Sequence, residues 1–126
     1  MIMKIDAIVR EEKFEDVKNA LMEIEVNGLT VSQVMGCGLQ RGYKEIVRGM
    51  EVEPQMQPKI KFEIVVSSEE WAEKTIEAIK KAAYTGEFGD GKIFSYPVAS
   101  ATKIRTGETS VEIREIRGRI LPRSQT

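Results

Sequence analysis

A glycine-rich segment at residues 85–92, Thr-Gly-Glu-Phe-Gly-Asp-Gly-Lys, has the composition best suited to hold an anion. Glycine allows a positive φ and lets backbone N–H groups approach an anion closely. Lys92 adds a mobile positive charge at the end of the segment. This composition indicates phosphate binding, and the alternative is an ordinary turn that leads into a strand.

The overall composition fits one globular domain. The chain has 126 residues, of which 41% are hydrophobic, and a formal net charge of −1. This charge gives no reason to expect a nucleic-acid partner. The only cysteine, Cys37, excludes an internal disulfide and a CxxC motif. Because no apolar run reaches the length of a signal core or membrane span, we expect a soluble, cytoplasmic protein without membrane insertion of its own.

The chain contains no histidine. Ser-His-Asp and Cys-His nucleophiles, HExxH zinc sites and imidazole acid–base catalysis are therefore excluded.

The apolar residues alternate between two periods and predict four strands and two helices. The first helix, over 11–25, has an apolar stripe of Phe14, Val17, Leu21 and Ile24 and ends at Asn27-Gly28. Ser67 followed by Glu70 is a capping-box signature that opens the second helix, which ends before Gly86. The strands are expected over 3–9, 29–35, 59–66 and 92–98.

The element order β-α-β-β-α-β predicts an α+β, ferredoxin-like sandwich in which two helices cover one face of a four-stranded sheet. We expect the other face to be apolar and to be buried in a symmetric oligomer. This topology serves many functions, so it does not by itself assign one.

A connection of more than twenty residues, from Gly36 to Pro58, separates the second and third predicted strands. A hairpin needs only two to five residues. The connection combines charges with apolar residues such as Ile46, Val47 and Met56. It is either a disordered excursion or a surface that docks on another protein.

Six motifs in order resemble the nitrogen regulatory protein PII family, the GlnB/GlnK-type signal transduction proteins. They lie at residues 28–34, 36–42, 48–51, 58–59, 85–94 and 103–108, and the resemblance extends from Met3 to about Glu108. It implies a domain over residues 1–108 that forms a homotrimer with its sheets facing inward. Residues 38–57 correspond to the family's T-loop. Residues 109–126 form a C-terminal extension, expected to be an extra strand, a basic arm or a flexible tail.

The resemblance also implies a nucleotide site for ATP or ADP in each cleft between subunits. Gly89-Asp90-Gly91-Lys92 would hold the phosphates, and the segment with Lys103 and Arg105 would reach across from the neighbouring subunit. The nucleotide-binding residues implied are Thr30, Gly36, Gly38, Leu39, Gln40, Val65, Gly89, Asp90, Gly91, Lys92, Lys103 and Arg105.

Further roles follow from the same resemblance. Gln40 would bind Mg²⁺ with ATP, and Gln40, Arg41 and Lys59 would bind 2-oxoglutarate. Arg48, Met50 and Val52 would dock on an ammonium channel or an enzyme of nitrogen metabolism.

The implied function is that of a nitrogen-regulating sensor whose T-loop conformation depends on nucleotide and 2-oxoglutarate. The resemblance thus implies a regulator of enzymes and transporters that is not itself an enzyme, and any ATPase activity would be incidental. The alternative is a PII-like adenine-nucleotide sensor that does not respond to 2-oxoglutarate and controls a different transporter or enzyme.

Four positions depart from the family pattern. Leu39 and Lys103 each stand where arginine is usual, which would weaken ATP binding or shift the preference towards ADP or AMP. Val52 and Met50 stand where other members are uridylylated or phosphorylated, so we expect no modification there.

Two other functional classes are less compatible with the residues. An acylphosphatase would need an arginine and an asparagine arranged for acyl phosphate, and no such loop is evident. An RNA-recognition module would place several aromatic residues on the third strand, which offers only Phe62.

Overall fold

A computed structural model of the chain describes residues 1–26, 28–38, 55–111, 115–116, 119–120 and 124–125. The elements in chain order are β1 (Met3–Arg10), η1 (Glu11–Lys13), α1 (Phe14–Glu23), β2 (Leu29–Gly38), β3 (Gln55–Val66), α3 (Glu69–Ala83), β4 (Gly91–Pro97), β5 (Ser100–Thr102), β6 (Thr109–Val111), β7 (Glu115–Ile116), β8 (Arg119–Ile120) and β9 (Ser124–Gln125).

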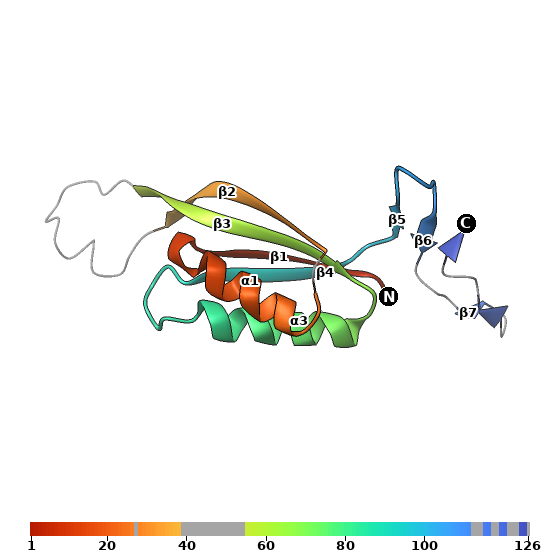
Figure 1. The fold of residues 1–126 in the computed structure, drawn as a ribbon, viewed down its shortest axis with the longest axis horizontal. Helices are drawn as coiled ribbons and strands as arrows, with labels where there is room; N and C mark the ends of the chain where they lie inside the picture. Colours follow the sequence, from red (N-terminus) through yellow and green to blue (C-terminus); the bar gives the residue numbers. More distant parts are fainter. Residues whose placement is uncertain (27, 39–54, 112–114, 117–118, 121–123, 126) are drawn as a thin grey trace, which may run out of the picture.

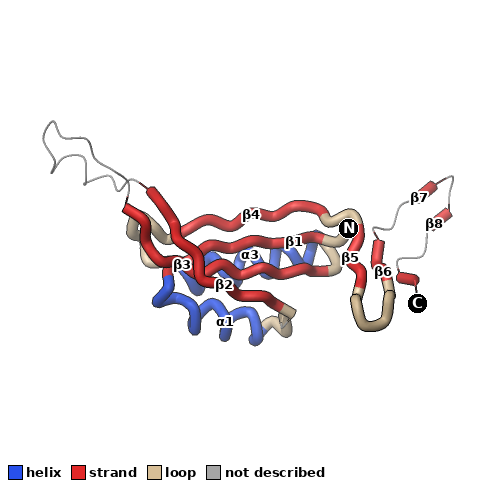
Figure 2. Tube along the Cα trace, turned by 90° about the horizontal axis from the view of Figure 1, so that it is seen from above, coloured by secondary structure: helices blue, strands red, loops and turns tan. Residues whose placement is uncertain are grey.

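The first four long strands form one antiparallel sheet in the order β2-β3-β1-β4. Helices α1 and α3 lie side by side on one face of this sheet (Figure 1). Seen from above, the strands lie over the two helices (Figure 2). The predicted α+β, ferredoxin-like arrangement is confirmed.

The core lies between the helices and the covered face of the sheet. Alternate residues of β1 and β3 are buried there, with Ile5 opposite Ile64 and Ala7 opposite Phe62. Val17 and Leu21 of α1 and Ile79 of α3 complete this core. Alternation along the strands and three- or four-residue spacing along the helices thus produce one shared apolar layer.

The open face of the sheet differs from the predicted apolar surface. Lys4 donates a hydrogen bond of 2.9 Å to Glu63, and the Tyr96 hydroxyl donates one of 2.7 Å to Asp6. The hydrogen bond to Glu63 is the main cause that raises the pKa of Lys4. The exposed large hydrophobic residues on this face, among the described residues, are Val65, Phe94 and Tyr96. The face is mixed rather than apolar because charged residues occupy alternate positions of β1 and β3, and its burial in a symmetric oligomer stays a prediction.

Helix α1 is shorter than predicted. A 3-10 turn, η1, precedes it, and it ends at Glu23 rather than at Asn27-Gly28. Glu25 adopts the left-handed conformation with φ of 64°, and the Val26 N–H donates to the Leu21 carbonyl at 2.9 Å. This is a Schellman ending in which a glutamate takes the position that usually holds glycine. The chain therefore turns earlier than the glycine signal indicates.

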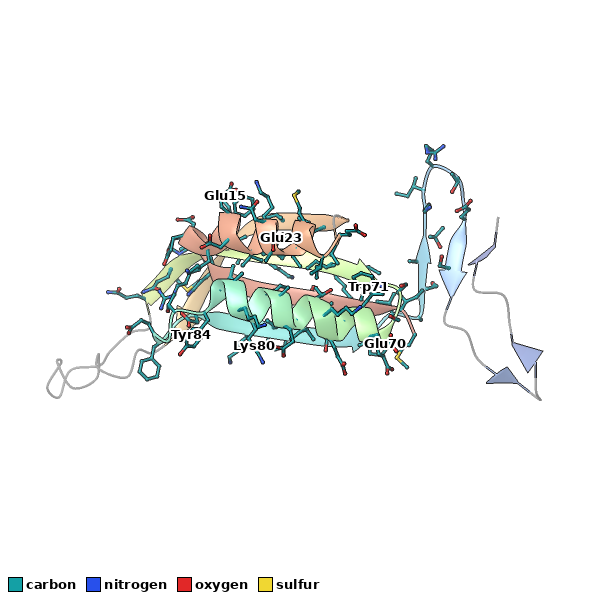
Figure 3. All side chains as sticks on the ribbon, turned by 60° about the horizontal axis from the view of Figure 1, so that its bottom comes forward. Glu15, Glu23, Glu70, Trp71, Lys80 and Tyr84 are labelled. Atoms are coloured by element: carbon teal, nitrogen blue, oxygen red, sulfur yellow. The ribbon has the colours of Figure 1, made fainter. Side chains whose placement is uncertain are left out.

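Ser68, not Ser67, caps helix α3. The Ser68 hydroxyl accepts a hydrogen bond of 3.1 Å from the Trp71 N–H. Because the residue three positions after Ser68 is tryptophan, the expected capping box with Glu70 does not form. Figure 3 shows Glu70 and Trp71 at the start of α3 and Tyr84 just beyond its end.

Strands β2 and β3 continue well beyond their predicted ends. Their pairing runs as far as Gly38 opposite Gln55, so only residues 39–54 separate the two strands. Pro58 lies inside β3, opposite Met35. It is tolerated because β1 pairs with β3 only up to Lys59, which leaves β3 with a single neighbour at Pro58.

The residues after β4 form separate small sheets. β5, β6 and β9 form a three-stranded sheet, and β7 pairs with β8. The β5–β6 hairpin lies at the opposite end of the main sheet from Gly38 and Gln55 (Figure 1). Within the described residues, no helix is both long and apolar enough to cross a membrane.

The capping assignment makes a direct prediction. Ser68→Ala should lower the free energy of unfolding by about 1 kcal/mol because the Trp71 N–H loses its acceptor. Ser67→Ala should change it by less than about 0.5 kcal/mol. Urea unfolding at one fixed protein concentration compares the two variants. An equal or larger loss for Ser67→Ala would contradict the assignment.

Candidate functional site

A cavity of about 580 Å³ lies at the end of the sheet where β2 and β3 lead into residues 39–54. Strands β2 and β3 supply one side of it, and the segment after α3 supplies the other. Lys59 and Lys92 are the cations among the described residues that line it. The full lining is Ile8, Gly36, Cys37, Gln55, Gln57, Lys59, Glu87, Phe88, Gly89, Asp90, Gly91, Lys92 and Phe94.

The segment between α3 and β4, residues 85–90, is closed on itself by the Asp90 carboxylate. Asp90 Oδ2 accepts hydrogen bonds from the N–H groups of Thr85 at 2.8 Å and Gly86 at 2.9 Å. The Thr85 hydroxyl donates to Asp90 Oδ1. We name residues 85–90 the anion loop, because they make up most of the glycine-rich segment 85–92 whose composition predicts phosphate binding.

The anion loop is also attached to the sheet. Arg10, the last residue of β1, donates from Nε to Asp90 Oδ1 at 2.9 Å and from Nη2 to the Phe88 carbonyl at 2.6 Å. Lys59 of β3 donates to the Gly89 carbonyl. Side chains from two strands thus hold three consecutive residues of the loop.

The electrostatics of Asp90 follow from these donors. The hydroxyl and N–H of Thr85, followed by the Arg10 guanidinium, hold the pKa of the Asp90 carboxyl well below its usual range. Asp90 is therefore ionised at neutral pH and already paired. Its contacts organise the loop, and its expected part in holding the phosphates of a nucleotide stays a prediction.

Gly91 begins β4 in a conformation that only glycine adopts easily. Its φ is 110°, and a Cβ placed on it would lie 1.8 Å from the Ile8 carbonyl oxygen. β4 therefore passes β1 at a distance that excludes a side chain at this position. This close approach fixes the position of the last residue before Lys92, and so the place where Lys92 enters the cavity lining.

The chemistry of the cavity favours an anion. Lys59 and Lys92 provide two positive charges against the one carboxylate of Glu87, while the charge of Asp90 is compensated by Arg10. Gly89 and Gly91 keep the wall free of side chains. A phosphate or carboxylate group fits this donor set. Among the described residues, no group of three or more Cys, Asp or Glu side chains is placed to bind a metal ion.

The cavity brings together six of the eleven sequence-predicted site residues that the structure describes. Gly36, Lys59, Gly89, Asp90, Gly91 and Lys92 all line it. Gly38 lies at the end of β2, opposite Gln55, which also lines the cavity.

A second group of predicted residues lies at the other end of the sheet. Thr30 is near the start of β2, and Val65, which is 49% exposed, is near the end of β3. Lys103 and Arg105 lie in the exposed turn between β5 and β6, where Lys103 Nζ is 3.6 Å from Glu108. One chain therefore does not bring these residues to the cavity.

The remaining predicted site residues lie outside the described residues. These are Leu39, Gln40, Arg41, Arg48, Met50 and Val52. Their expected roles with Mg²⁺, 2-oxoglutarate and partner proteins stay predictions.

Sequence reasoning did not identify Arg10 as part of the site. The contact between Arg10 and Asp90 joins residues that are 80 positions apart, so local spacing carries no sign of it. The available signal was a cation at the end of β1 on the open face, two positions after Ile8.

Gly91→Ala should destabilise the protein severely, because the new Cβ would collide with the Ile8 carbonyl oxygen. We expect a loss of at least about 3 kcal/mol or insoluble protein. Gly28→Ala is the control, since nothing lies within 4 Å of a Cβ there. Thermal unfolding of both variants measures the difference, and a stable Gly91→Ala variant would refute the close approach.

Asp90→Asn should lower stability at pH 7, and the difference from the wild type should shrink as the pH falls below about 4. The reason is that a depressed pKa stabilises the folded protein above the unfolded-state pKa, and this contribution is lost as Asp90 becomes protonated. Asp16→Asn, at an exposed helix position, is the control. A difference for Asp90→Asn that stays constant from pH 7 to pH 3 would contradict the assignment.

Comparison with known proteins places this geometry in a family. The model described as "Nitrogen regulatory protein P-II" matches residues 2–108. The nitrogen regulatory protein P-II 1 of Methanothermobacter thermautotrophicus is 51% identical over 105 residues, which are 83% of this chain and 90% of that protein. The nitrogen regulatory protein P-II of Rhizobium meliloti is 46% identical over 109 residues, which are 86% of this chain and 96% of that protein.

A solved structure agrees with these matches. The crystal structure of Arabidopsis thaliana PII bound to citrate is similar with a TM-score of 0.67 and 38% identity, and the match covers 86% of this chain and 88% of that one. The family resemblance found in the sequence motifs is confirmed. The chain belongs to the nitrogen regulatory protein P-II family.

Proposed function

We propose that this chain is a cytoplasmic signal transduction protein that binds ATP or ADP in clefts between the subunits of a homotrimer. In this proposal Mg²⁺ and 2-oxoglutarate bind beside ATP, and residues 38–57 dock on an ammonium channel or an enzyme of nitrogen assimilation. The relatives are named as regulatory proteins, which supports a regulatory rather than an enzymatic role.

The observation that carries the proposal is the separation of the predicted site residues into two groups. Thr30 and Gly38 lie eight residues apart on one strand, which corresponds to about 27 Å. This is longer than one nucleotide. The residues can serve one ligand only if the second group comes from another copy of the chain, which supports a site between subunits.

The site residues that line the cavity, which form the first group, support the binding of a phosphate there. Lys92 is the second residue of β4, next to the anion loop, and the glycines of this segment allow backbone N–H groups to approach a ligand. Arg105 is exposed in the β5–β6 turn and can form a bidentate contact with a phosphate of a nucleotide held by a neighbouring copy.

A polycarboxylate effector is supported by Lys59. Its ammonium group lines the cavity, and the Arabidopsis relative is described as bound to citrate, which carries three carboxylate groups. A carboxylate of 2-oxoglutarate would approach Lys59 next to the phosphates. Mg²⁺ with ATP would supply oxygen-coordinated positive charge between the two ligands.

One observation favours a second candidate, an adenine-nucleotide sensor that does not respond to 2-oxoglutarate and controls a different target. Lys59 already donates a hydrogen bond to the Gly89 carbonyl. A keto acid would have to displace this contact before it could pair with Lys59, which lowers its affinity.

The site between subunits predicts complementation. Lys92→Gln removes a cation from the first group, and Arg105→Gln removes one from the second. Each variant alone should bind ATP at least about tenfold more weakly than the wild type. Trimers reassembled from both variants should regain some sites of wild-type affinity, because some clefts combine the two unchanged groups.

Calorimetric titration of ATP and ADP with Mg²⁺ measures these affinities, with and without 2-oxoglutarate. Sedimentation measures whether the protein is a trimer. Mixed trimers that regain no tight sites would place both groups in one chain and refute the proposed cleft. If ATP binds but 2-oxoglutarate never binds in its presence, the second candidate function replaces the first.

A further inference from the structure

Arg10 forms the structural connection between strand β1 and the anion loop. Its guanidinium donates to Asp90 Oδ1 at 2.9 Å and to the Phe88 carbonyl at 2.6 Å. These two acceptors lie on either side of Gly89. The end of β1 and the loop after α3 lie at the same end of the sheet (Figures 1 and 2).

The other hydrogen bonds of Asp90 are internal to the loop. Thr85 and Gly86 donate to its carboxylate, and the Glu87 N–H donates to the Thr85 hydroxyl at 3.1 Å. These contacts set the shape of the loop but not its position on the sheet. The side chains of Arg10 and Lys59 tie the loop to β1 and β3.

Arg10 is not placed as a ligand. It is not among the described residues that line the cavity, and its side chain is only 20% exposed. Two of its nitrogens are used by Asp90 and Phe88, and its Nη1 is 3.8 Å from Glu12. A phosphate in the cavity would therefore meet Lys92 and Lys59, with Arg10 behind the loop.

The sheet register explains why Arg10 needs Asp90. Arg10 and Lys59 are directly opposite each other on β1 and β3. Like charges in this arrangement repel. Asp90 compensates Arg10, and Lys59 keeps its charge towards the cavity while it donates to the Gly89 carbonyl. The ion pair between Arg10 and Asp90 thus reduces the repulsion that Lys59 would otherwise experience from Arg10.

We propose that Arg10 is a positioning residue that sets the distance between the anion loop and the two cavity lysines, and so determines the affinity for the phosphate groups of a nucleotide. This inference rests on the proposed nucleotide-binding function. Arg10 acts through Phe88 and Asp90 and does not itself contact the ligand. Its loss would leave the fold and the internal loop contacts intact but would release the loop from the sheet.

The test compares ATP, ADP and adenosine binding to the wild type, Arg10→Gln and Arg10→Lys. Arg10→Gln should weaken ATP and ADP binding about tenfold or more, as loss of a supporting contact commonly does. Adenosine, which lacks phosphate, should bind within about twofold of the wild type. Arg10→Lys should be intermediate, because it keeps the charge for Asp90 but loses the fork that also reaches Phe88.

Glu12→Gln is the matched control, since Glu12 is the exposed carboxylate at 3.8 Å from Arg10 and lies outside the loop. Its nucleotide affinities should equal those of the wild type. Amide hydrogen exchange of residues 85–91 without ligand gives a second readout and should accelerate in Arg10→Gln. Should Arg10→Gln not fold, the comparison of Arg10→Lys with the wild type decides the question in the same direction.

The outcomes separate this inference from the function on which it rests. A wild-type protein that binds neither ATP nor ADP refutes the proposed function and with it the nucleotide role of Arg10. A wild-type protein that binds ATP while Arg10→Gln binds it equally well refutes only the role of Arg10. Equal weakening of ATP and adenosine, with a lower melting temperature, would show a general structural effect and would also overturn the inference.

Discussion

The candidate site depends on the hydrogen bonds and the ion pair that the ionised carboxylate of Asp90 accepts. It gathers two backbone N–H groups, a hydroxyl and a guanidinium, so the loop after α3 has one closed shape. The same carboxylate compensates Arg10 and allows a second cation, Lys59, to stand directly opposite it. With Asp90 paired, the charged side chains that remain in the cavity lining are Lys59, Lys92 and Glu87, which leaves one net positive charge. A loop that is organised before its ligand arrives has less conformational entropy to lose on binding.

The fold places this loop at one end of the sheet and the β5–β6 turn at the other. Four antiparallel strands carry the two groups of site residues to opposite ends, and no bending of β2 brings Thr30 to Gly36. The open face between them carries ordered polar contacts such as Lys4 with Glu63. Asp6 Oδ1 is buried there without a hydrogen-bond partner among the described residues. Such an acceptor can be satisfied when this face meets another copy, as the proposed trimer requires.

The fold could be predicted where burial imposes a period on the sequence. β1, β3 and both helices each place apolar residues on one face, and these elements were found within a few residues of their true ends. The extension of β3 to Gln55 could not be predicted, because residues 55–58 are all exposed and show no alternation. Ser67 and Ser68 are equally good caps by type, and only the backbone geometry selects Ser68. The anion loop could be predicted from its glycines, but its ion pair with Arg10 could not, because that contact joins residues that only the tertiary structure brings together.

The extended pairing of β2 with β3 places the last paired residues before positions 39–54 in the lining of the cavity. Gly36, Cys37, Gln55 and Gln57 line the cavity and also belong to the last paired positions before that segment begins. A ligand in the cavity therefore contacts the strand ends from which the segment emerges. Such contact shifts a conformational equilibrium only if the ligand binds one arrangement more tightly than the other. Lys59 can provide this difference, because its ammonium group pairs either with the Gly89 carbonyl or with a ligand anion. The exchange of Lys59 between the Gly89 carbonyl and a ligand anion would couple ligand binding to the conformation of the anion loop and of the strand ends.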